Sequence, residues 1–152
     1  MKIIAKNKKA FFDYQILETI EAGLVLTGDE VKSLRSGNVS MSGAFAHERE
    51  GELFMVNVII VPYQFAYDKT NDSGDRRRKL LLSRKQINQL TMAVARRGIT
   101  IVPLKMYFNK KSLVKVEIGL CKARKKHDKR QLLKDRDIDR ETKRDLKNVT
   151  RD

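Results

Sequence analysis

The residues in this chain that are best placed for chemistry are cations that could bind phosphate groups. A basic run at residues 76–79 leads into an apolar triplet and then into a predicted helix, whose first turn carries Arg84. Because the helix dipole disfavours a cation in the first turn, we expect these charges to have another partner. The pattern predicts a phosphate site formed by Arg78, Lys79, Arg84 and nearby backbone amides. A solvated charged loop is the alternative interpretation.

A second group of cations lies in residues 122–152, where apolar residues are sparse. It begins with a basic run at residues 124–130. Arg136, Arg140 and Arg144 then recur at every fourth residue, and an acidic stripe follows with the same spacing. Like charges at this spacing do not stabilise an isolated helix. We therefore expect this tail to be disordered in the free protein and helical only against RNA, with a permanently unstructured, solubilising tail as the alternative.

A smaller third group, Lys32 and Arg35, lies on a helix predicted to begin after Thr27. The first turn of that helix carries Asp29 and Glu30, which satisfy the helix dipole but repel phosphate. Any RNA contact of this helix is therefore expected from its middle or end, at Lys32 and Arg35. A simply solvated helix surface is the alternative.

The overall charge favours a polyanionic partner. The 152 residues include 33 Lys and Arg against 19 Asp and Glu, a formal net charge of +14. Nucleic acid and an anionic membrane both fit this charge. No apolar run approaches the roughly 20 residues needed to cross a bilayer, and the N-terminus lacks the apolar block of a signal peptide. A cytoplasmic nucleic-acid partner, and no membrane, is therefore predicted.

Patterns typical of catalysis and metal binding are missing from the sequence. It has one cysteine, Cys121, and two histidines, His47 and His127, and so few candidate ligands predict that there is no zinc site. It also lacks a Gly-rich phosphate loop, a His-Glu metal helix and a nucleophile elbow. We therefore expect no catalytic residues, no metal and no cofactor, and we interpret the chain as an RNA binder that is not an enzyme.

The elements that would position these residues are mostly strands. Apolar residues alternate with polar ones most clearly near residue 118, which is the two-residue period of a half-buried strand. The predicted strands are 14–18 and 20–26, a hairpin of 44–47 with 53–61, and a hairpin of 99–108 with 113–120.

Two helices have clear start and stop signals. Each begins with a capping box, in which a Ser or Thr is followed three residues later by Glu or Gln, and each stops at a glycine. The signals are Thr27, Glu30 and Gly37 for the first helix, and Ser83, Gln86 and Gly98 for the second. The positions predicted to face the core are Val31, Leu34, Ile87, Leu90 and Val94.

Five or six antiparallel strands with two short helices close most easily into a barrel, because a small open sheet would leave edges to protect. Among small barrels, the oligonucleotide-binding type is common and uses a strand face to bind RNA. The predicted fold class is therefore mainly β with short helices. It comprises an oligonucleotide-binding-type antiparallel β-barrel in residues 1–121 and a basic C-terminal tail, 122–152, that is disordered when free.

Several stretches resemble one known family, the SsrA-binding protein or small protein B family of bacterial trans-translation. The block Glu-Val-Lys-Ser-Leu-Arg at residues 30–35 and the Asp-Lys-Arg motif at residues 128–130 are specific when they occur together. The resemblance spans nearly the whole chain in the right order, over residues 7–10, 13–14, 21–37, 78–82, 102–108, 114–120 and 125–130. Two stretches depart from it: Phe11-Phe12 replaces a frequent Arg-His, and the loop at 64–75 lacks the usual elements.

The resemblance implies a concrete function. Family members have an oligonucleotide-binding-type barrel and bind the tRNA-like domain of transfer-messenger RNA near its elbow. They help to deliver this RNA, as alanyl-tmRNA with elongation factor Tu, to stalled ribosomes. In the family, the tail is disordered in solution and becomes helical in the decoding centre and empty mRNA channel, against small-subunit rRNA.

The resemblance also implies site residues. Glu21 matches a glutamate that contributes to RNA binding, and Leu81 and Ser83 match a second RNA-contact patch, where Ser83 replaces the more usual Asn or His. In the tail, the matching ribosome-binding positions lie within the run Lys126, His127, Asp128, Lys129 and Arg130.

Two other function classes stay open at this point. A structural ribosomal protein can also be small and basic with a disordered extension. A small nuclease or RNA-modifying enzyme is the third possibility, although the sequence offers little chemistry for it. Composition and periodicity by themselves indicate only a basic β-barrel that binds RNA, and the choice of RNA depends on the resemblance.

Overall fold

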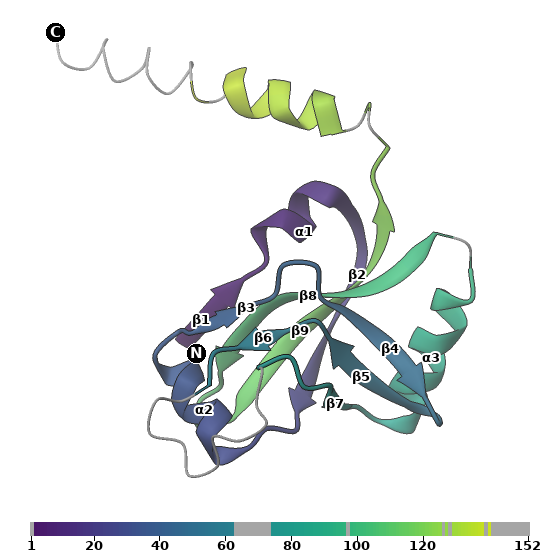
Figure 1. The fold of residues 1–152 in the computed structure, drawn as a ribbon. Helices are drawn as coiled ribbons and strands as arrows, with labels where there is room; N and C mark the ends of the chain where they lie inside the picture. Colours follow the sequence, from purple (N-terminus) through teal and green to yellow (C-terminus); the bar gives the residue numbers. More distant parts are fainter. Residues whose placement is uncertain are drawn as a thin grey trace, which may run out of the picture.

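The computed structural model describes residues 2–62, 74–96, 98–125, 127, 129–138 and 140. Figure 1 shows a β-rich body from which a helix at residues 129–138 extends. The strands are β1 (Lys2–Lys6), β2 (Tyr14–Leu24), β3 (Val39–Ser40), β4 (Phe45–Arg49), β5 (Glu52–Val56), β6 (Ile59–Ile60), β7 (Arg78–Leu81), β8 (Ile99–Phe108) and β9 (Val114–Ala123). The helices are α1 (Lys8–Asp13), α2 (Gly28–Arg35) and α3 (Arg84–Val94).

The strands form a curled antiparallel sheet in the order β1-β8-β9-β2-β7-β5-β4. The sheet closes into a barrel because β4, at one end of this order, packs against β8 near the other end (Figure 1). β1 pairs with the last part of β8, and β3 and β6 form a separate small pair. The predicted fold class, a mainly β barrel of the oligonucleotide-binding type with short helices, is confirmed.

Both predicted hairpins form, but two predicted strand boundaries were wrong. The strand expected over 53–61 ends at Val56, because Asn57 takes a positive φ of 65° and turns the chain toward β6. The break expected near residue 19 is absent, since a bulge between Ile16 and Glu18 lets β2 continue along β9. The sequence analysis also missed β1, α1, β3 and β7.

Both predicted capping boxes are present. The Thr27 hydroxyl accepts a hydrogen bond from the Glu30 amide at 3.2 Å, and the Glu30 carboxylate accepts one from the Thr27 amide at 2.9 Å. Ser83 and Gln86 make the same pair of bonds at the start of α3. The side chains of both helix starts are therefore fixed by local hydrogen bonds, as predicted.

The core-facing side of α3 differs by one residue from the prediction. Ile87 and Leu90 are buried, and Ala93 packs against the same core, whereas Val94 is 38% exposed. The buried stripe thus continues at three-residue spacing, which turns Val94 toward solvent. On α2, Leu34 is buried as expected and Val31 is half-buried.

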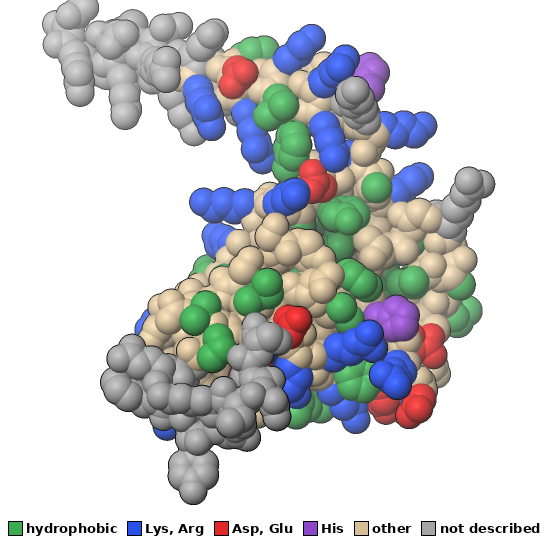
Figure 2. Space-filling model, in the orientation of Figure 1, with side chains coloured by type: hydrophobic (Ala, Val, Ile, Leu, Met, Phe, Trp, Pro, Cys, Tyr) green, Lys and Arg blue, Asp and Glu red, His purple; other side chains and the backbone are tan. Residues whose placement is uncertain are grey.

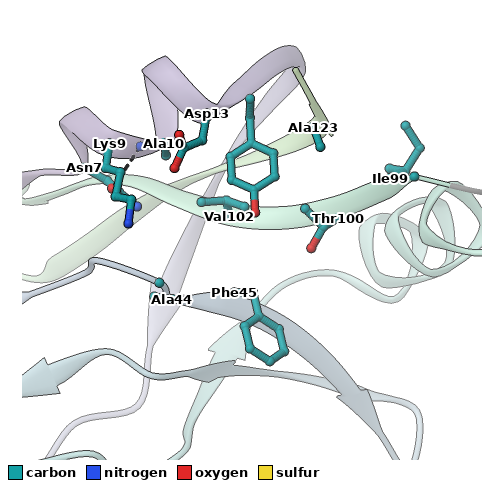
Figure 3. Close-up of a pocket in the computed structure, with 13 residues that line it drawn as sticks. Asn7, Lys9, Ala10, Asp13, Ala44, Phe45, Ile99, Thr100, Val102 and Ala123 are labelled. Carbon is teal, nitrogen blue, oxygen red and sulfur yellow. Dashed lines mark hydrogen bonds between the residues drawn. The ribbon is translucent and has the colours of Figure 1, made fainter. Parts of the chain in front are cut away.

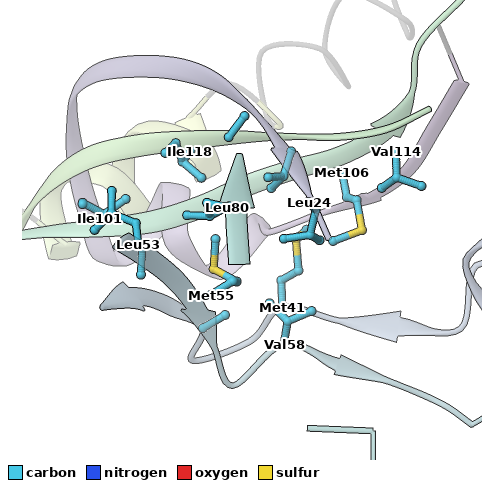
Figure 4. Packing of buried hydrophobic residues seen from close by; sticks show 14 of the residues in the cluster. Leu24, Met41, Leu53, Met55, Val58, Leu80, Ile101, Met106, Val114 and Ile118 are labelled. Carbon is cyan, nitrogen blue, oxygen red and sulfur yellow. The ribbon is translucent and has the colours of Figure 1, made fainter. Parts of the chain in front are cut away.

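Buried apolar residues form two clusters on opposite sides of the sheet. The larger fills the barrel and includes Met55, Leu80 and Ile118 (Figure 4). The smaller lies outside the barrel, under α1, and consists of Ala10, Val102, Leu104 and Cys121. The sheet face that α1 covers is therefore apolar, and the remainder of that outer face is available for other contacts.

The tail leaves the body after β9, which ends at Ala123, and residues 129–138 are helical (Figure 1). An isolated helix of this length is marginal in water, so its order depends on its contacts. The division into a body of residues 1–121 and a tail of residues 122–152, and the disorder of the free tail, stay predictions. Among the described residues, no helix is long and apolar enough to cross a membrane.

Candidate RNA interface

Two rows of outward-facing side chains cross neighbouring strands of the barrel. Strand register places Lys105 of β8 opposite Glu117 of β9, and Glu117 opposite Glu21 of β2. The next row runs from β8 to β7 through Tyr107, Lys115, Gly23 and Leu81. We call these two rows the outer strand face.

Glu21 is exposed on this face and is oriented by a neighbour. The Tyr107 hydroxyl donates a short hydrogen bond to Oε2 of Glu21. Burial, and then the hydrogen bond and charge of Glu21, raise the pKa of Tyr107 well above its ordinary value, so Tyr107 remains a donor. Oε1 of Glu21 can accept a hydrogen bond from a ribose 2′-hydroxyl or a base amino group.

Lys105 offsets the cost of placing two carboxylates opposite each other. Glu21 and Glu117 are direct cross-strand partners, an arrangement that is destabilising by itself. The Lys105 ammonium lies 3.4 Å from Oε2 of Glu117 and 5.7 Å from the centre of the Tyr107 ring. The outer strand face thus carries both acceptors and cations, a mixture suited to recognising hydroxyls and phosphates together.

Leu81 lies beside Glu21 on the same face and depends on a glycine. Leu81 is 53% exposed and pairs with Gly23. A Cβ at Gly23 would lie only 3.1 Å from Leu81 Cβ, so the absence of a side chain lets Leu81 lean over β2. The structure therefore brings together two residues, Glu21 and Leu81, that the sequence analysis assigned to separate RNA contacts.

The predicted phosphate site is wrong for Arg78. This side chain is completely buried, and its guanidinium donates to Glu30 Oε2 at 2.6 Å, to the Val58 carbonyl at 2.7 Å and to the Gly74 carbonyl at 3.0 Å. Because these contacts use its donors inside the protein, Arg78 cannot reach a phosphate. Its hydrogen bonds connect β7 to α2 and to the backbone at residues 58 and 74.

Glu30 completes this buried cluster. Burial by itself raises its pKa, but hydrogen bonds from Thr27 and Arg76 and the charge of Arg78 outweigh burial and hold the pKa below its ordinary value. Glu30 is therefore ionised at neutral pH and neutralises the buried guanidinium of Arg78. Glu30, the N3 residue of the α2 capping box, is therefore also the counter-ion of Arg78 on β7, which lies far away in the sequence.

Lys79 and Arg84 are exposed and share an acidic partner within the protein. Arg84 donates to the Gly51 carbonyl at 2.7 Å and lies 3.2 Å from Glu52, and the Lys79 ammonium lies 4.0 Å from the same carboxylate. The partner that we expected for a cation in the first turn of α3 is thus the β4–β5 hairpin. A role for Lys79 and Arg84 in RNA binding stays a prediction.

The other predicted body residues lie near helix ends. Lys32 and Arg35 are exposed in the last turn of α2. Ser83 caps α3, because its Oγ accepts from the Gln86 amide, and this leaves its hydroxyl hydrogen available to a ligand. RNA contact at these three residues stays a prediction.

The described part of the tail carries several of the predicted ribosome-binding residues. His127, Arg130, Arg136 and Arg140 are exposed, and Lys129 is half-buried. Figure 2 shows Lys and Arg side chains gathered around the tail helix. The remaining predicted positions, Lys126, Asp128 and Arg144, lie outside the described residues.

Comparison with known proteins decides the family. The family model described as SmpB protein matches residues 4–148. An SsrA-binding protein of Coprothermobacter proteolyticus is 46% identical over 97% of this chain and 98% of its own length. Another from Acidiphilium cryptum is 51% identical, over 96% of this chain and 91% of its own length.

The chain belongs to the SmpB family. A solved structure described as "tmRNA-SmpB: a journey to the center of the bacterial ribosome" is 44% identical, with a TM-score of 0.67 over 80% of this chain and 85% of that chain. The family resemblance predicted from short motifs is therefore confirmed over nearly the full length.

Sequence reasoning missed four charged or aromatic residues of the outer strand face in this SmpB-family protein. These residues, predicted only as strand residues, are Lys105, Tyr107, Lys115 and Glu117. Their alternation with apolar residues in the predicted hairpin was a signal that they face outward. What the sequence could not give is the register that aligns them with Glu21 on β2.

A hollow of about 530 Å³ lies between α1 and the place where β4 meets β8 (Figure 3). Its walls include Lys9 from α1 and, across the hollow, Phe45 from β4. Asn7 beside it is structural, because its side chain caps α1 and donates to the carbonyls of Met41 and Pro103.

In the described parts of the chain, no group of three or more His, Cys, Asp and Glu could hold a metal ion.

Proposed function

We propose that this protein binds the tRNA-like domain of transfer-messenger RNA and delivers that RNA to stalled ribosomes in trans-translation. The observation that carries the proposal is an identity of 46–51% to SsrA-binding proteins over at least 96% of this chain. The protein acts in the cytoplasm as a non-catalytic adaptor for alanyl-tmRNA with elongation factor Tu.

The outer strand face supports this function by its chemistry. Exposed Leu81 offers an apolar contact beside the oriented acceptor of Glu21, and Lys115 adds a cation in the same row. Structured RNA presents 2′-hydroxyls and phosphates at defined spacing, so a rigid sheet with fixed acceptors and cations recognises it by shape. The more distant cations Lys32, Arg35, Lys79 and Arg84 then add phosphate contacts.

The tail has the second role in this proposal. It enters the decoding centre and the empty mRNA channel, where the cations of residues 126–144 bind small-subunit rRNA and a helix forms over the tail. Coupled folding on a polyanion suits a segment whose like-charged stripes oppose a helix in isolation.

Deleting the tail after Lys125 tests this division. Among the described residues, the core clusters contain none beyond Cys121, so the truncated protein should keep its fold. We expect it to bind a tRNA-like transcript within about threefold of the full chain, since the outer strand face that this proposal assigns to that RNA lies wholly in the body. A reconstituted assay of peptide tagging on stalled ribosomes should show no tagging.

Three outcomes would contradict the proposal. Tagging by the truncated protein would remove the assigned role of the tail. Stoichiometric protein on salt-washed ribosomes would instead indicate a structural ribosomal protein. Cleavage or modification of the transcript by the purified chain would establish an enzyme.

A further inference from the structure

The tail helix lies against α1 through a small set of contacts. The Phe12 ring of α1 has the Lys129 ammonium 5.9 Å from its centre and the Arg136 guanidinium carbon 5.8 Å from it. Lys129 also lies 3.2 Å from Oδ1 of Asp13. The start of the tail is fixed as well, because Arg124 donates through Nε to the Tyr14 carbonyl at 3.2 Å.

This docking brings cations of the tail next to cations of the body. Together they line a cleft of about 560 Å³. The body contributes Lys6, Lys8 and Lys105, and the tail contributes Arg136 and Arg140. The one carboxylate of the described lining is Glu117, which is already paired with Lys105.

The docked state concentrates positive charge in the cleft. Exposed ion pairs and cation–π contacts each contribute little, whereas the four lining cations other than the paired Lys105 repel one another. An anion in the cleft would remove that repulsion and hold the tail on the body. By linkage, it would bind more tightly when the tail is docked.

The wall of the cleft indicates the class of anion. Phe11 lines the cleft and is 42% exposed, so an aromatic ring lies among the cations. Cations that follow a phosphate backbone beside an aromatic ring are the arrangement that binds single-stranded nucleic acid, where the ring stacks on an unpaired base. A volume of this size suits one or two nucleotides.

We propose that α1 and the docked tail helix form a binding cleft for a single-stranded RNA segment. Arg136, Arg140 and Lys8 contact its phosphates, and an unstacked base lies on Phe11. The site adjoins the outer strand face assigned to the tRNA-like domain, because Lys105 and Glu117 belong to both, and it exists only while the tail is docked.

Binding of a labelled, unstructured RNA of about ten nucleotides to the full chain tests the cleft by fluorescence anisotropy. Replacing Arg136 and Arg140 by Ala should lower affinity about tenfold and reduce the slope of log K against log salt by about 1.4, the value for two single-strand phosphate contacts. The matched control is Arg130→Ala with Lys134→Ala, which removes the same charge from residues that do not line the cleft. It should change affinity by less than about threefold.

Two further variants separate stacking from docking. Phe11→Leu keeps the apolar volume but removes the ring, and should lower single-strand affinity about fivefold or more. Phe12→Leu leaves the cleft lining intact but removes the two cation–π contacts that dock the tail. It should weaken the single strand while affinity for a tRNA-like transcript stays within about twofold, because that RNA binds the outer strand face.

Each contrary result overturns a stated part of the inference. An equal loss for the control pair would show that only total charge matters. An unchanged Phe12→Leu variant would remove the docked tail from the site, and equal affinity for a duplex of the same length would exclude single-strand recognition. Loss of binding to the tRNA-like transcript alone would contradict the proposed function but leave the cleft standing.

Discussion

Replacing Glu30 by Gln is expected to destabilise the protein more than any comparable surface change. Gln keeps the size of the side chain and can still accept from the Thr27 amide, so the start of α2 is preserved. What it removes is the negative charge beside Arg78, whose side chain is fully buried. The variant thus leaves the buried Arg78 without a counter-ion and also removes the pair with the 45% exposed Arg76, which contributes little by comparison.

The expected loss of unfolding free energy follows from the complete burial of Arg78. Removing one member of a buried ion pair costs about 3–5 kcal/mol, because the remaining charge stays desolvated without a counter-ion. Arg78 keeps its bonds to two carbonyls, so the lower half of that range applies. With about 2 cal/mol/K of unfolding entropy per residue over a body of roughly 120 residues, a loss of about 3 kcal/mol lowers Tm by about 12 °C.

The chain offers a matched control in Glu52→Gln. Glu52 also pairs with two cations, Lys79 and Arg84, but these are 43% and 62% exposed. Exposed pairs contribute about 0–1 kcal/mol, so the control should lower Tm by no more than about 4 °C. Thermal and urea unfolding of both variants, followed by circular dichroism, measure the difference.

The effect should also depend on pH with a definite sign. The pKa of Glu30 is lowered in the folded protein, so its ionised form contributes stability above the ordinary carboxyl pKa of about 4.3. That contribution is lost as the pH falls through the folded pKa. The gap between the wild type and Glu30→Gln should therefore be full at pH 7 and shrink below about pH 4. Equal, small shifts for Glu30→Gln and Glu52→Gln at pH 7 would refute the reasoning.

Two other predictions concern the RNA interface and the backbone. Tyr107→Phe removes the hydroxyl that orients Glu21; we expect about fivefold weaker binding of a tRNA-like transcript, measured by filter binding, from the loss of one hydrogen bond worth about 1 kcal/mol. Unchanged affinity would show that Glu21 needs no such support. Gly74→Ala should lower the free energy of unfolding by more than about 2 kcal/mol, because Gly74 has a φ of +80° and an added Cβ would lie 2.4 Å from the Ile60 carbonyl oxygen. Gly28→Ala, which meets nothing within 4 Å, is the control and should be neutral or slightly stabilising in the same urea titration; equal effects would contradict this prediction.

The parts of the fold that depend on neighbouring residues could be predicted from the sequence. Both capping boxes involve residues three apart, and the β8–β9 hairpin joins strands that are adjacent in the chain. The prediction of a strand break near residue 19 was wrong because β2 depends on a strand that is distant in the sequence. A bulge lets β2 continue past polar residues, and its stability comes from pairing with β9, which lies about a hundred residues further along.

In the candidate site, too, the sequence predicted the residue types but not which distant segments bury or pair with them. Residue type correctly indicated a basic chain that has RNA as its partner. The assignment of Glu21 and Leu81 to RNA contacts came from the family resemblance and stays a prediction. Residue type could not distinguish Arg78 from Lys79, although one is buried and the other exposed. Their difference arises from alternation across β7, a strand whose sequence carries too little periodicity to be recognised.

Sequence by itself determined the charge, the helix starts, the main hairpins and the family. Tertiary structure decided which cations face solvent, that Glu30 neutralises Arg78, and that the tail lies on Phe12 of α1. The physical reason is that charges and caps are properties of local residue type, whereas burial and ion pairing depend on which distant segments the closure of the barrel brings together.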